Sequence, residues 1–313
     1  MNNGSRMIAL GHYQPTRVLT NHELAETVDT NDEWIRSRVG IETRRIAAPD
    51  ETVADMATAA ADKALANSGL TAADIDMVVV ATCSAAERCP NVAARVAGAL
   101  GITAPAAYDL NTACSGFSYA LATVDHAIRA GSGRNAIVIG AEKLSDITDW
   151  TDRSTCVIFG DGAGAAVVTA SEQPDIGPVL WGSEPDKQDA VIIEGWRPHI
   201  QQAGQTVFRW AAFSLPKLAL ETCARAGVKP QELAAFIPHQ ANLRIIEPLG
   251  RKLGAQDAVI ATDVVESGNT SAASIPLALS KLVERREIPS GAPVLLFGFG
   301  GGLTYAGQVV RCP

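Results

Sequence analysis

The sequence lacks any long uninterrupted run of apolar residues. No stretch approaches the roughly 18 consecutive apolar residues of a membrane-spanning helix, and the first ten residues lack the apolar region and cleavage site of a secretory leader. We therefore expect a cytoplasmic protein with no membrane partner.

The sequence also has no Cys-x-x-Cys pair. Its six cysteines, at positions 83, 89, 114, 156, 223 and 312, do not have the spacing of a zinc site or a thioredoxin-like motif. In a reducing compartment they are expected to be free thiols. We predict no metal and no redox cofactor.

Positive charge is scarce. The 26 lysines and arginines are outnumbered by 34 aspartates and glutamates, so the net charge is −8 and no basic run with interleaved aromatic residues occurs. Nucleic-acid binding needs a concentrated basic surface, and we exclude it. The chain has 313 residues, 47% of them apolar, which is enough for a large core in one or two domains.

Cys114 is the most informative residue that is present. The surrounding Asp109-Leu-Asn-Thr-Ala-Cys-Ser-Gly-Phe117 predicts a buried strand, a sharp turn and the start of a helix, with the thiol at the turn. Unpaired N–H groups and the helix dipole at such a start favour thiolate over thiol. The alternative is a small buried apolar residue, which is what most free cysteines are.

Two later segments contain polar residues that the fold has to bring to Cys114. His239 follows an apolar strand within residues 236–246, and Asn269 stands just before a helix within residues 267–276. A strand-end polar residue and a helix N-cap are the alternatives for these two residues. The separations along the chain, 239 − 114 = 125 and 269 − 239 = 30, exclude a locally formed site.

Together these segments resemble the Cys-His-Asn set of the decarboxylating condensing enzymes, and the resemblance is closest to β-ketoacyl-acyl carrier protein synthase III of the thiolase-fold superfamily. Further matching blocks lie at residues 29–41, 152–165 and 298–302, in the family's order, so the resemblance covers nearly the whole chain. It implies five α-β-α-β-α layers built from two duplicated α/β halves. We place these halves at residues 1–170 and 171–313.

An internal repeat supports the duplication. Residues 67–80 align with 225–238 at an offset of 225 − 67 = 158, and residues 159–164 align with 297–302 at an offset of 297 − 159 = 138. The first half would thus carry about 20 extra residues between the two echoes, by the difference of these offsets. Amphipathic helices are predicted at 53–68 and 114–130. The glycines at 160–164 enter a β-rich tail without a following helix, which disfavours a dinucleotide site.

The resemblance assigns roles to the three polar residues. Cys114 would attack an acyl-CoA thioester and hold the acyl group. His239 and Asn269 would donate hydrogen bonds to the malonyl thioester oxygen and stabilise the enolate that forms as CO2 leaves. The backbone amides of Cys114 and Gly301 would form an oxyanion hole.

The resemblance also implies two binding surfaces. For CoA, Trp34 and Arg153 would sandwich the adenine and Arg38 would contact a phosphate. For an acidic carrier protein, a basic patch is predicted that comprises Arg209, Arg244, Arg251 and Lys252. Arg244, Arg251 and Lys252 share a helical face. Ordinary exposed side chains are the alternative for both surfaces.

The chain departs from the family between residues 182 and 203, where relatives have a longer connection that helps to wall the substrate channel. The shorter segment predicts a more open mouth. Cys89, before Pro90, stands where relatives reach across a dimer interface into the partner's acyl pocket. A homodimer is therefore implied, with Cys89 in its acyl pocket or merely packed at its interface.

The predicted activity is a decarboxylative condensation of an acyl-CoA starter with malonyl-acyl carrier protein. It gives 3-oxoacyl-carrier protein, CO2 and CoA, and would initiate fatty-acid or polyketide synthesis. The alternative is an acyltransferase of the same fold that passes the acyl group to a hydroxyl or amine of a secondary metabolite. A non-catalytic protein that only binds CoA or carrier protein is a third reading, which the intact Cys-His-Asn set disfavours.

Overall fold

A computed structural model describes residues 4–87, 89–193 and 199–313 and contains two five-stranded sheets. The first sheet has the order β1 (Gly4–Tyr13), β7 (Gly162–Ser171), β6 (Asn135–Glu142), β4 (Met77–Ala81) and β5 (Ala106–Leu110). The second has the order β8 (Leu180–Ser183), β14 (Thr304–Arg311), β13 (Pro293–Gly300), β11 (Ala235–Pro238) and β12 (Val259–Ile260). Taken along the chain, both sheets follow the same strand order.

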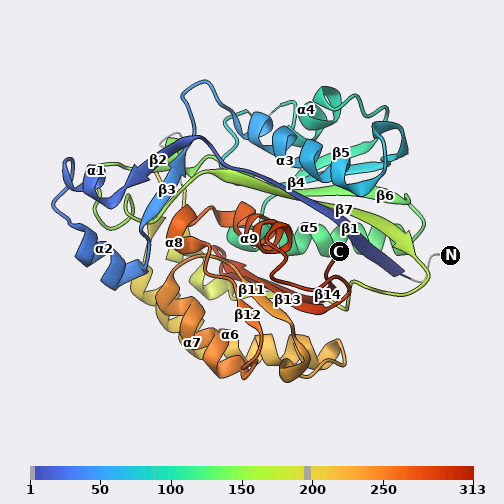
Figure 1. Ribbon diagram of the computed structural model, residues 1–313. Helices are drawn as coiled ribbons and strands as arrows, with labels where there is room; N and C mark the ends of the chain where they lie inside the picture. Colours follow the sequence, from blue (N-terminus) through green and yellow to red (C-terminus); the bar gives the residue numbers. More distant parts are fainter. Residues whose placement is uncertain (1–3, 88, 194–198) are drawn as a thin grey trace.

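Helices form three layers around the two sheets (Figure 1). The outer face of the first sheet carries α3 (Val53–Ser68) and α4 (Val92–Ala99), and that of the second carries α6 (Gly204–Arg225) and α7 (Leu243–Leu253). Between the sheets lie α5 (Gly116–Arg129) and α9 (Ser274–Glu284). The predicted five-layered thiolase-like fold is confirmed.

Smaller elements complete the chain. They are β2 (Arg17–Thr20), α1 (Asn21–Ala25), α2 (Asp32–Val39), β3 (Thr43–Ile46), β9 (Val191–Ile192), β10 (Gln201–Gln202) and α8 (Val264–Ser267). No helix of the described ranges is long and apolar enough to cross a membrane.

Helix α3 shows how local sequence fixes an element. Its N-cap Thr52 forms a capping box with Asp55, and Gly69 ends it in the left-handed conformation with φ 75°. Small buried alanines on α3 and Gly11 on β1 let the helix approach the strand closely. A Cβ on Gly11 would lie 2.3 Å from the carbonyl oxygen of Ala60. The predicted helix at residues 53–68 is confirmed.

The duplication runs through the fold at a constant offset. The starts of β4 and β11, of β6 and β13, and of α5 and α9 each differ by 158 residues (235 − 77, 293 − 135 and 274 − 116). This is the offset of the first predicted echo.

The second echo is not a structural equivalence. Residues 159–161 precede β7, whereas Phe297 lies inside β13 and pairs with β11. The extra residues of the first half lie in the β6–β7 connection, which has 19 residues (143–161) against three between β13 and β14 (301–303). As predicted, the glycines at 160–164 lead into a strand and no helix follows them.

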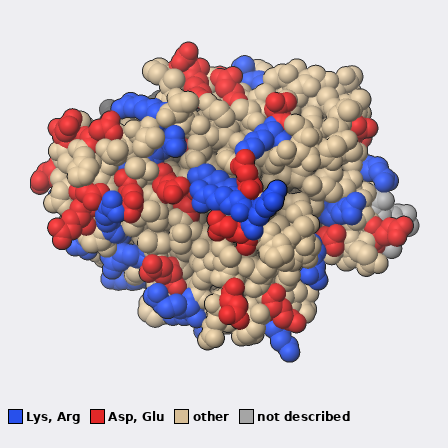
Figure 2. All heavy atoms as spheres, viewed as in Figure 1, with Lys and Arg blue, Asp and Glu red and all other residues tan. Residues whose placement is uncertain are grey.

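The strand before Cys114 corrects another prediction. We expected β5 to be buried, but it forms the edge of the first sheet, with Ala106 exposed and the other four residues half-buried. Charge is mixed over the face drawn in Figure 2, where the main group of basic side chains is flanked by acidic ones.

Candidate active site

Cys114 lies in a tight turn between β5 and α5. Residues Ala113–Ser115 form one 3-10 turn, in which Ala113 has a φ of 48°. The side-chain oxygen of Asn111 accepts the N–H of Ala113 at 3.1 Å and closes the turn. The predicted strand, turn and helix are confirmed, although the α-helix itself begins two residues after Cys114.

The second half contains the same turn. Ser271 has a φ of 47°, begins a 3-10 turn before α9, and donates its N–H to the side-chain oxygen of Asn269 at 2.8 Å. The sequences Asn111-Thr-Ala-Cys-Ser-Gly116 and Asn269-Thr-Ser-Ala-Ala-Ser274 therefore align at the same offset of 158. The equivalent of Asn269 is Asn111, and that of Cys114 is Ala272.

Each turn packs on a glycine of the opposite half. A Cβ on Gly140 of β6 would lie 2.2 Å from the carbonyl oxygen of Ala272, and a Cβ on Gly298 of β13 would lie 3.0 Å from the Cα of Ser115. These two glycines are also 158 residues apart. The two turns thus meet between the sheets because both central strands leave room for them.

Cys114 faces an inner cavity of about 470 Å³. Strand β13 approaches it closely, since a Cβ on Gly300 would lie 2.6 Å from the Cβ of Cys114. The cavity wall also includes apolar residues of the 182–203 segment, namely Val191, Ile192, Ile193 and Ile200.

The protonation state of Cys114 corrects the expectation of a thiolate. Burial raises the pKa of the thiol to about 11, against the lowering effects of hydrogen bonds from the Ser271 hydroxyl and the Gly301 amide. Desolvation outweighs these hydrogen bonds in the unliganded site. The resting side chain is therefore a thiol.

His239 follows β11 as predicted and is only 2% exposed. Its backbone N–H donates to the Phe297 carbonyl at 2.8 Å, and its ring lies edge-on to the Phe299 ring with the two ring centres 5.2 Å apart. Burial lowers the pKa of His239 to about 3, so the ring is neutral.

Ser274 lies against Nδ1 of that neutral ring. Its hydroxyl oxygen accepts the N–H of Gln240 at 3.3 Å and lies 2.7 Å from Nδ1 of His239. A hydroxyl that donates to Nδ1 would place the ring proton on Nε2, and His239 would then be a hydrogen-bond donor there.

Asn269 faces a different, outer cavity of about 520 Å³. Its backbone is held in a parallel bridge with Phe159, and its N–H donates to the Ile158 carbonyl at 2.9 Å. The outer cavity is also lined by Arg38, Arg209 and Arg244. This cavity is therefore lined by residues that were predicted to act in catalysis, in CoA binding and in carrier-protein binding.

Trp34 and Arg153 come together from segments 119 residues apart (153 − 34). The Arg153 guanidinium lies 5.0 Å from the centre of the Trp34 ring, and that of Arg38 lies 5.9 Å from it. A flat base between Trp34 and Arg153 would need a separation of about 7 Å, twice an optimal contact distance of about 3.5 Å. Arg153 is exposed and has to shift to admit an adenine.

The four predicted carrier-protein contacts divide into two groups. Arg209 and Arg244 line the outer cavity, and the Arg244 guanidinium lies 5.7 Å from the centre of the Phe208 ring. Arg251 and Lys252 are exposed in the last turn of α7. Cys89 is exposed and lies in the turn before α4, outside the residues that line the inner cavity of its own chain.

Our sequence reasoning missed four residues that contact the triad or one another: Cys83, Glu142, Ser271 and Ser274. The signal for the two serines was the repeat of residues 111–116 at 269–274. Glu142 had no local signal, because it ends an otherwise apolar strand.

Two family models match the chain. The model described as 3-oxoacyl-(acyl-carrier-protein (ACP)) synthase III matches residues 108–185, and its C-terminal counterpart matches residues 223–312. Among curated relatives, β-ketoacyl-(acyl-carrier-protein) synthase III 4 of Streptomyces coelicolor is 65% identical over 100% of both chains. Synthase III 2 of Streptomyces avermitilis is 64% identical over 99% of this chain and 100% of the relative.

Solved structures of similar proteins have the same fold. The priming β-ketosynthase of the R1128 polyketide biosynthetic pathway superposes with a TM-score of 0.98 at 40% identity, covering 100% of this chain and 97% of that one. The 3-oxoacyl-(acyl-carrier-protein) synthase III of Aquifex aeolicus superposes with a TM-score of 0.94 at 41% identity, covering 98% and 100%.

Proposed function

The chain belongs to the 3-oxoacyl-(acyl-carrier-protein) synthase III family, and we propose that its two cavities together serve both half-reactions of a condensing enzyme. An acyl-CoA starter acylates the protein, and malonyl-acyl carrier protein then receives the acyl group with loss of CO2. The products are CoA, CO2 and a 3-oxoacyl-carrier protein that begins a fatty-acid or polyketide chain. The observation that supports this most is the duplicated turn, which brings a thiol and a separate polar set into one site.

In the first half-reaction, Cys114 attacks the thioester carbonyl and releases CoA. The oxygen of the tetrahedral intermediate would lie where the amides of Cys114 and Gly301 donate, since both amides lie close enough to the sulfur to lower the pKa of its thiol. The acyl chain occupies the inner cavity. A thioester is exchanged for a thioester, so the activation of the acyl group is kept.

In the second half-reaction, the malonyl thioester oxygen binds to the Nε2 proton of His239 and the side-chain amide of Asn269. Loss of CO2 leaves an enolate on that oxygen, and two neutral donors stabilise it in a site with little water. The carbanion attacks the acyl carbonyl on Cys114. The carbon–sulfur bond of the acyl-enzyme breaks, and Cys114 is regenerated.

The binding surfaces are assigned from position and charge. The adenine of CoA binds at Trp34 and Arg153, with Arg38 near its phosphates, and the pantetheine arm passes through the outer cavity. Carrier protein docks on α6 and α7 through Arg209, Arg244, Arg251 and Lys252. Phe213 stands one helical turn from Arg209, is 76% exposed, and supplies an apolar contact for the carrier.

A homodimer is supported by the edge of the first sheet. In the described ranges no strand covers the free side of β5, and an unprotected edge of this kind favours pairing with another chain. The Cys89 turn lies beside that edge, since Asn91 donates to the Ala107 carbonyl at 3.0 Å. Pairing across β5 would bring Cys89 to the partner's acyl cavity. Light scattering should give twice the chain mass of 32.7 kDa, and a monomer would overturn the pairing.

Intact-protein mass spectrometry tests the function. The protein is mixed with acetyl-, propionyl-, butyryl- and isobutyryl-CoA, and malonyl-carrier protein is then added. The expected result is one acyl mass that is absent in Cys114→Ala and that is discharged into 3-oxoacyl-carrier protein with release of CO2. The other cysteines remain in Cys114→Ala, so this variant identifies the acylated thiol.

Two other outcomes would contradict the proposal. Stable acylation that malonyl-carrier protein does not discharge would indicate an acyltransferase for another acceptor. Absence of acylation would remove the first half-reaction. The predictions of a cytoplasmic location, a more open mouth and no cofactor remain predictions from the sequence.

A further inference from the structure

Glu142, at the end of β6, is a fully buried carboxylate. It accepts the hydroxyl of Thr82 at 3.1 Å, the N–H of Cys83 at 3.1 Å and the thiol of Cys83 at 3.3 Å, and it also accepts the hydroxyl of Ser84. A buried charge is normally paired with an opposite charge or shifted toward its neutral form.

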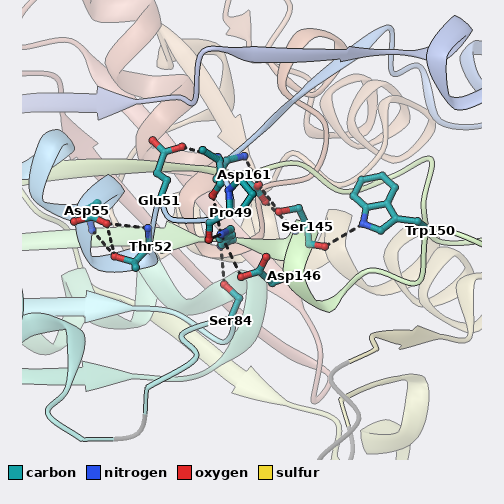
Figure 3. A network of polar contacts seen from close by, with 12 residues as sticks. Pro49, Glu51, Thr52, Asp55, Ser84, Ser145, Asp146, Trp150 and Asp161 are labelled. Carbon is teal, nitrogen blue, oxygen red and sulfur yellow. Dashed lines mark hydrogen bonds and ion pairs between the residues drawn. The ribbon is translucent and has the colours of Figure 1, made fainter.

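No cation of the described residues neutralises this carboxylate. The Nζ of the neighbouring Lys143 instead donates to the carbonyls of Ala48 at 3.0 Å and Pro49 at 3.2 Å and pairs with Asp146 at 3.4 Å. Pro49 and Asp146 belong to the polar network drawn in Figure 3. Burial accordingly raises the pKa of Glu142. The titratable groups that face it are the thiols of Cys83 and Cys114.

The Ser271 hydroxyl lies between this carboxylate and the nucleophile. It lies close enough to Cys114 and to Glu142 to lower the pKa of each, and its oxygen is 3.9 Å from the sulfur of Cys83. Cys83, Cys114 and Ser271 all line the inner cavity, and the Cys83 thiol donates to Glu142 at 3.3 Å, so the carboxylate lies directly behind the cavity wall that contains the nucleophile.

The protonated thiol needs a base near it before it can attack. Cys114 is protonated, and attack on a thioester requires that its proton be taken up by a base. Burial lowers the pKa of His239 to about 3, and Ser274 occupies its Nδ1, so this ring is a poor base. Among the groups named here, Glu142 is the base that lies beside the same Ser271 hydroxyl as the Cys114 thiol.

We propose that Glu142 receives the proton of Cys114 through the hydroxyl of Ser271 during acylation. This inference rests on the proposed function. The thiol proton passes to Ser271 while the Ser271 proton passes to Glu142, and the sulfur electron pair forms the bond to the acyl carbon. The bond between that carbon and the CoA sulfur breaks. The proton returns along the same path to the CoA thiolate, so acyl-CoA and thiol become acyl-enzyme and CoA, and Glu142 is again ionised.

Single-turnover acylation tests the relay in Glu142→Gln and Ser271→Ala. Asp161→Asn is the matched control, because Asp161 is also a buried carboxylate, and among the residues that the structure describes it has no cation partner and accepts from Ala47 and Ser145 alone. The probe is whichever of acetyl-, propionyl-, butyryl- and isobutyryl-CoA acylates the native chain fastest. Decarboxylation of malonyl-carrier protein, which uses His239 and Asn269, is measured in parallel, and circular dichroism checks folding.

The relay predicts acylation about 100-fold slower in Glu142→Gln and in Ser271→Ala, within the range of about 10²–10⁴ for a general base. Decarboxylation should stay within about threefold of native, and Asp161→Asn should change neither half-reaction by more than that. The pH profile separates the relay from a structural role. Native acylation should level off above the pKa of Glu142, whereas Glu142→Gln should keep rising with hydroxide toward the thiol pKa.

Equal acylation in native protein and Glu142→Gln would overturn the relay, as would an equal loss of both half-reactions or an unchanged pH profile. Glu142→Asp keeps the carboxylate and should recover part of the rate and the plateau. Failure of the native chain to be acylated would instead contradict the proposed function.

Discussion

Replacing Ser274 with alanine is expected to slow condensation and to leave acylation of Cys114 unchanged. The hydroxyl of Ser274 lies 2.7 Å from Nδ1 of His239 and, by donating there, would hold the ring proton on Nε2. Without it, the neutral ring also populates the tautomer with the proton on Nδ1. That tautomer cannot donate to the enolate oxygen from Nε2.

The size of the effect follows from the hydrogen bond that is lost. A neutral hydrogen bond contributes about 0.5–1.5 kcal/mol, and about 1.4 kcal/mol is tenfold in an equilibrium. Ser274→Ala should therefore slow condensation about twofold to tenfold. His239→Ala removes the donor itself and should cost about 10²–10³-fold, as loss of an oxyanion-hole donor does.

Helix α9 offers a matched control in Ser280→Ala. Ser280 makes a similar bond to Nδ1 of His12 at 2.8 Å, so this variant also removes a serine–histidine hydrogen bond from the same helix. Both variants should lose comparable stability in urea denaturation. Release of CO2 from malonyl-carrier protein after acylation measures the condensation step. The tautomer argument fails if Ser280→Ala slows that step as much as Ser274→Ala, or if neither does.

Three further predictions concern packing, CoA and pH. Gly300→Ala should abolish acylation, measured by mass spectrometry, because the added Cβ would lie 3.0 Å from the sulfur of Cys114. Gly98→Ala in helix α4 is the control, since a Cβ there meets nothing within 4 Å, and it should be fully active. Trp34→Ala should raise the KM for acyl-CoA about tenfold, since stacking on a base is worth about 1–3 kcal/mol, but not the KM for the matching acyl-pantetheine, which has no adenine. Burial lowers the pKa of His12 to about 4 and that of His239 to about 3, from 6.5 in the unfolded chain. As pH falls from 6.5 toward 4 the unfolded chain binds more protons, so the free energy of unfolding should fall by up to about 1.4 kcal/mol per pH unit for each histidine, and His12→Gln should flatten this dependence in urea titrations.

The sequence predicted those parts of the fold that depend on local pattern. Thr52 and Gly69 mark the two ends of α3, and the Asn-Thr pairs precede both turns. The edge position of β5 was not predicted, because the place of Ala106–Leu110 is set by the order of strands in the sheet. Strand order depends on contacts between distant segments, which a local pattern does not contain.

Cys114 and Asn269 lie at matching turns where the two halves meet. Two other features depended on the size of an effect or on tertiary contacts. Whether Cys114 is a thiol or a thiolate depends on whether burial outweighs the hydrogen bonds to the sulfur, and burial prevails in the unliganded structure. Glu142 could not be found in advance, because its surroundings come from residues 82–84 and the turn of Ser271.

The matching turns bear on how such a protein diverges. Positions 114 and 272 share one backbone geometry, yet one side chain is the proposed site of acylation and the other is a methyl group. Gly140 and Gly298, by contrast, are both glycine, since each meets the other half's main chain. The requirement for shape thus falls on both copies, and the requirement for chemistry falls on one. Aligning the halves of this single chain therefore separates residues that the scaffold requires from residues that the reaction requires.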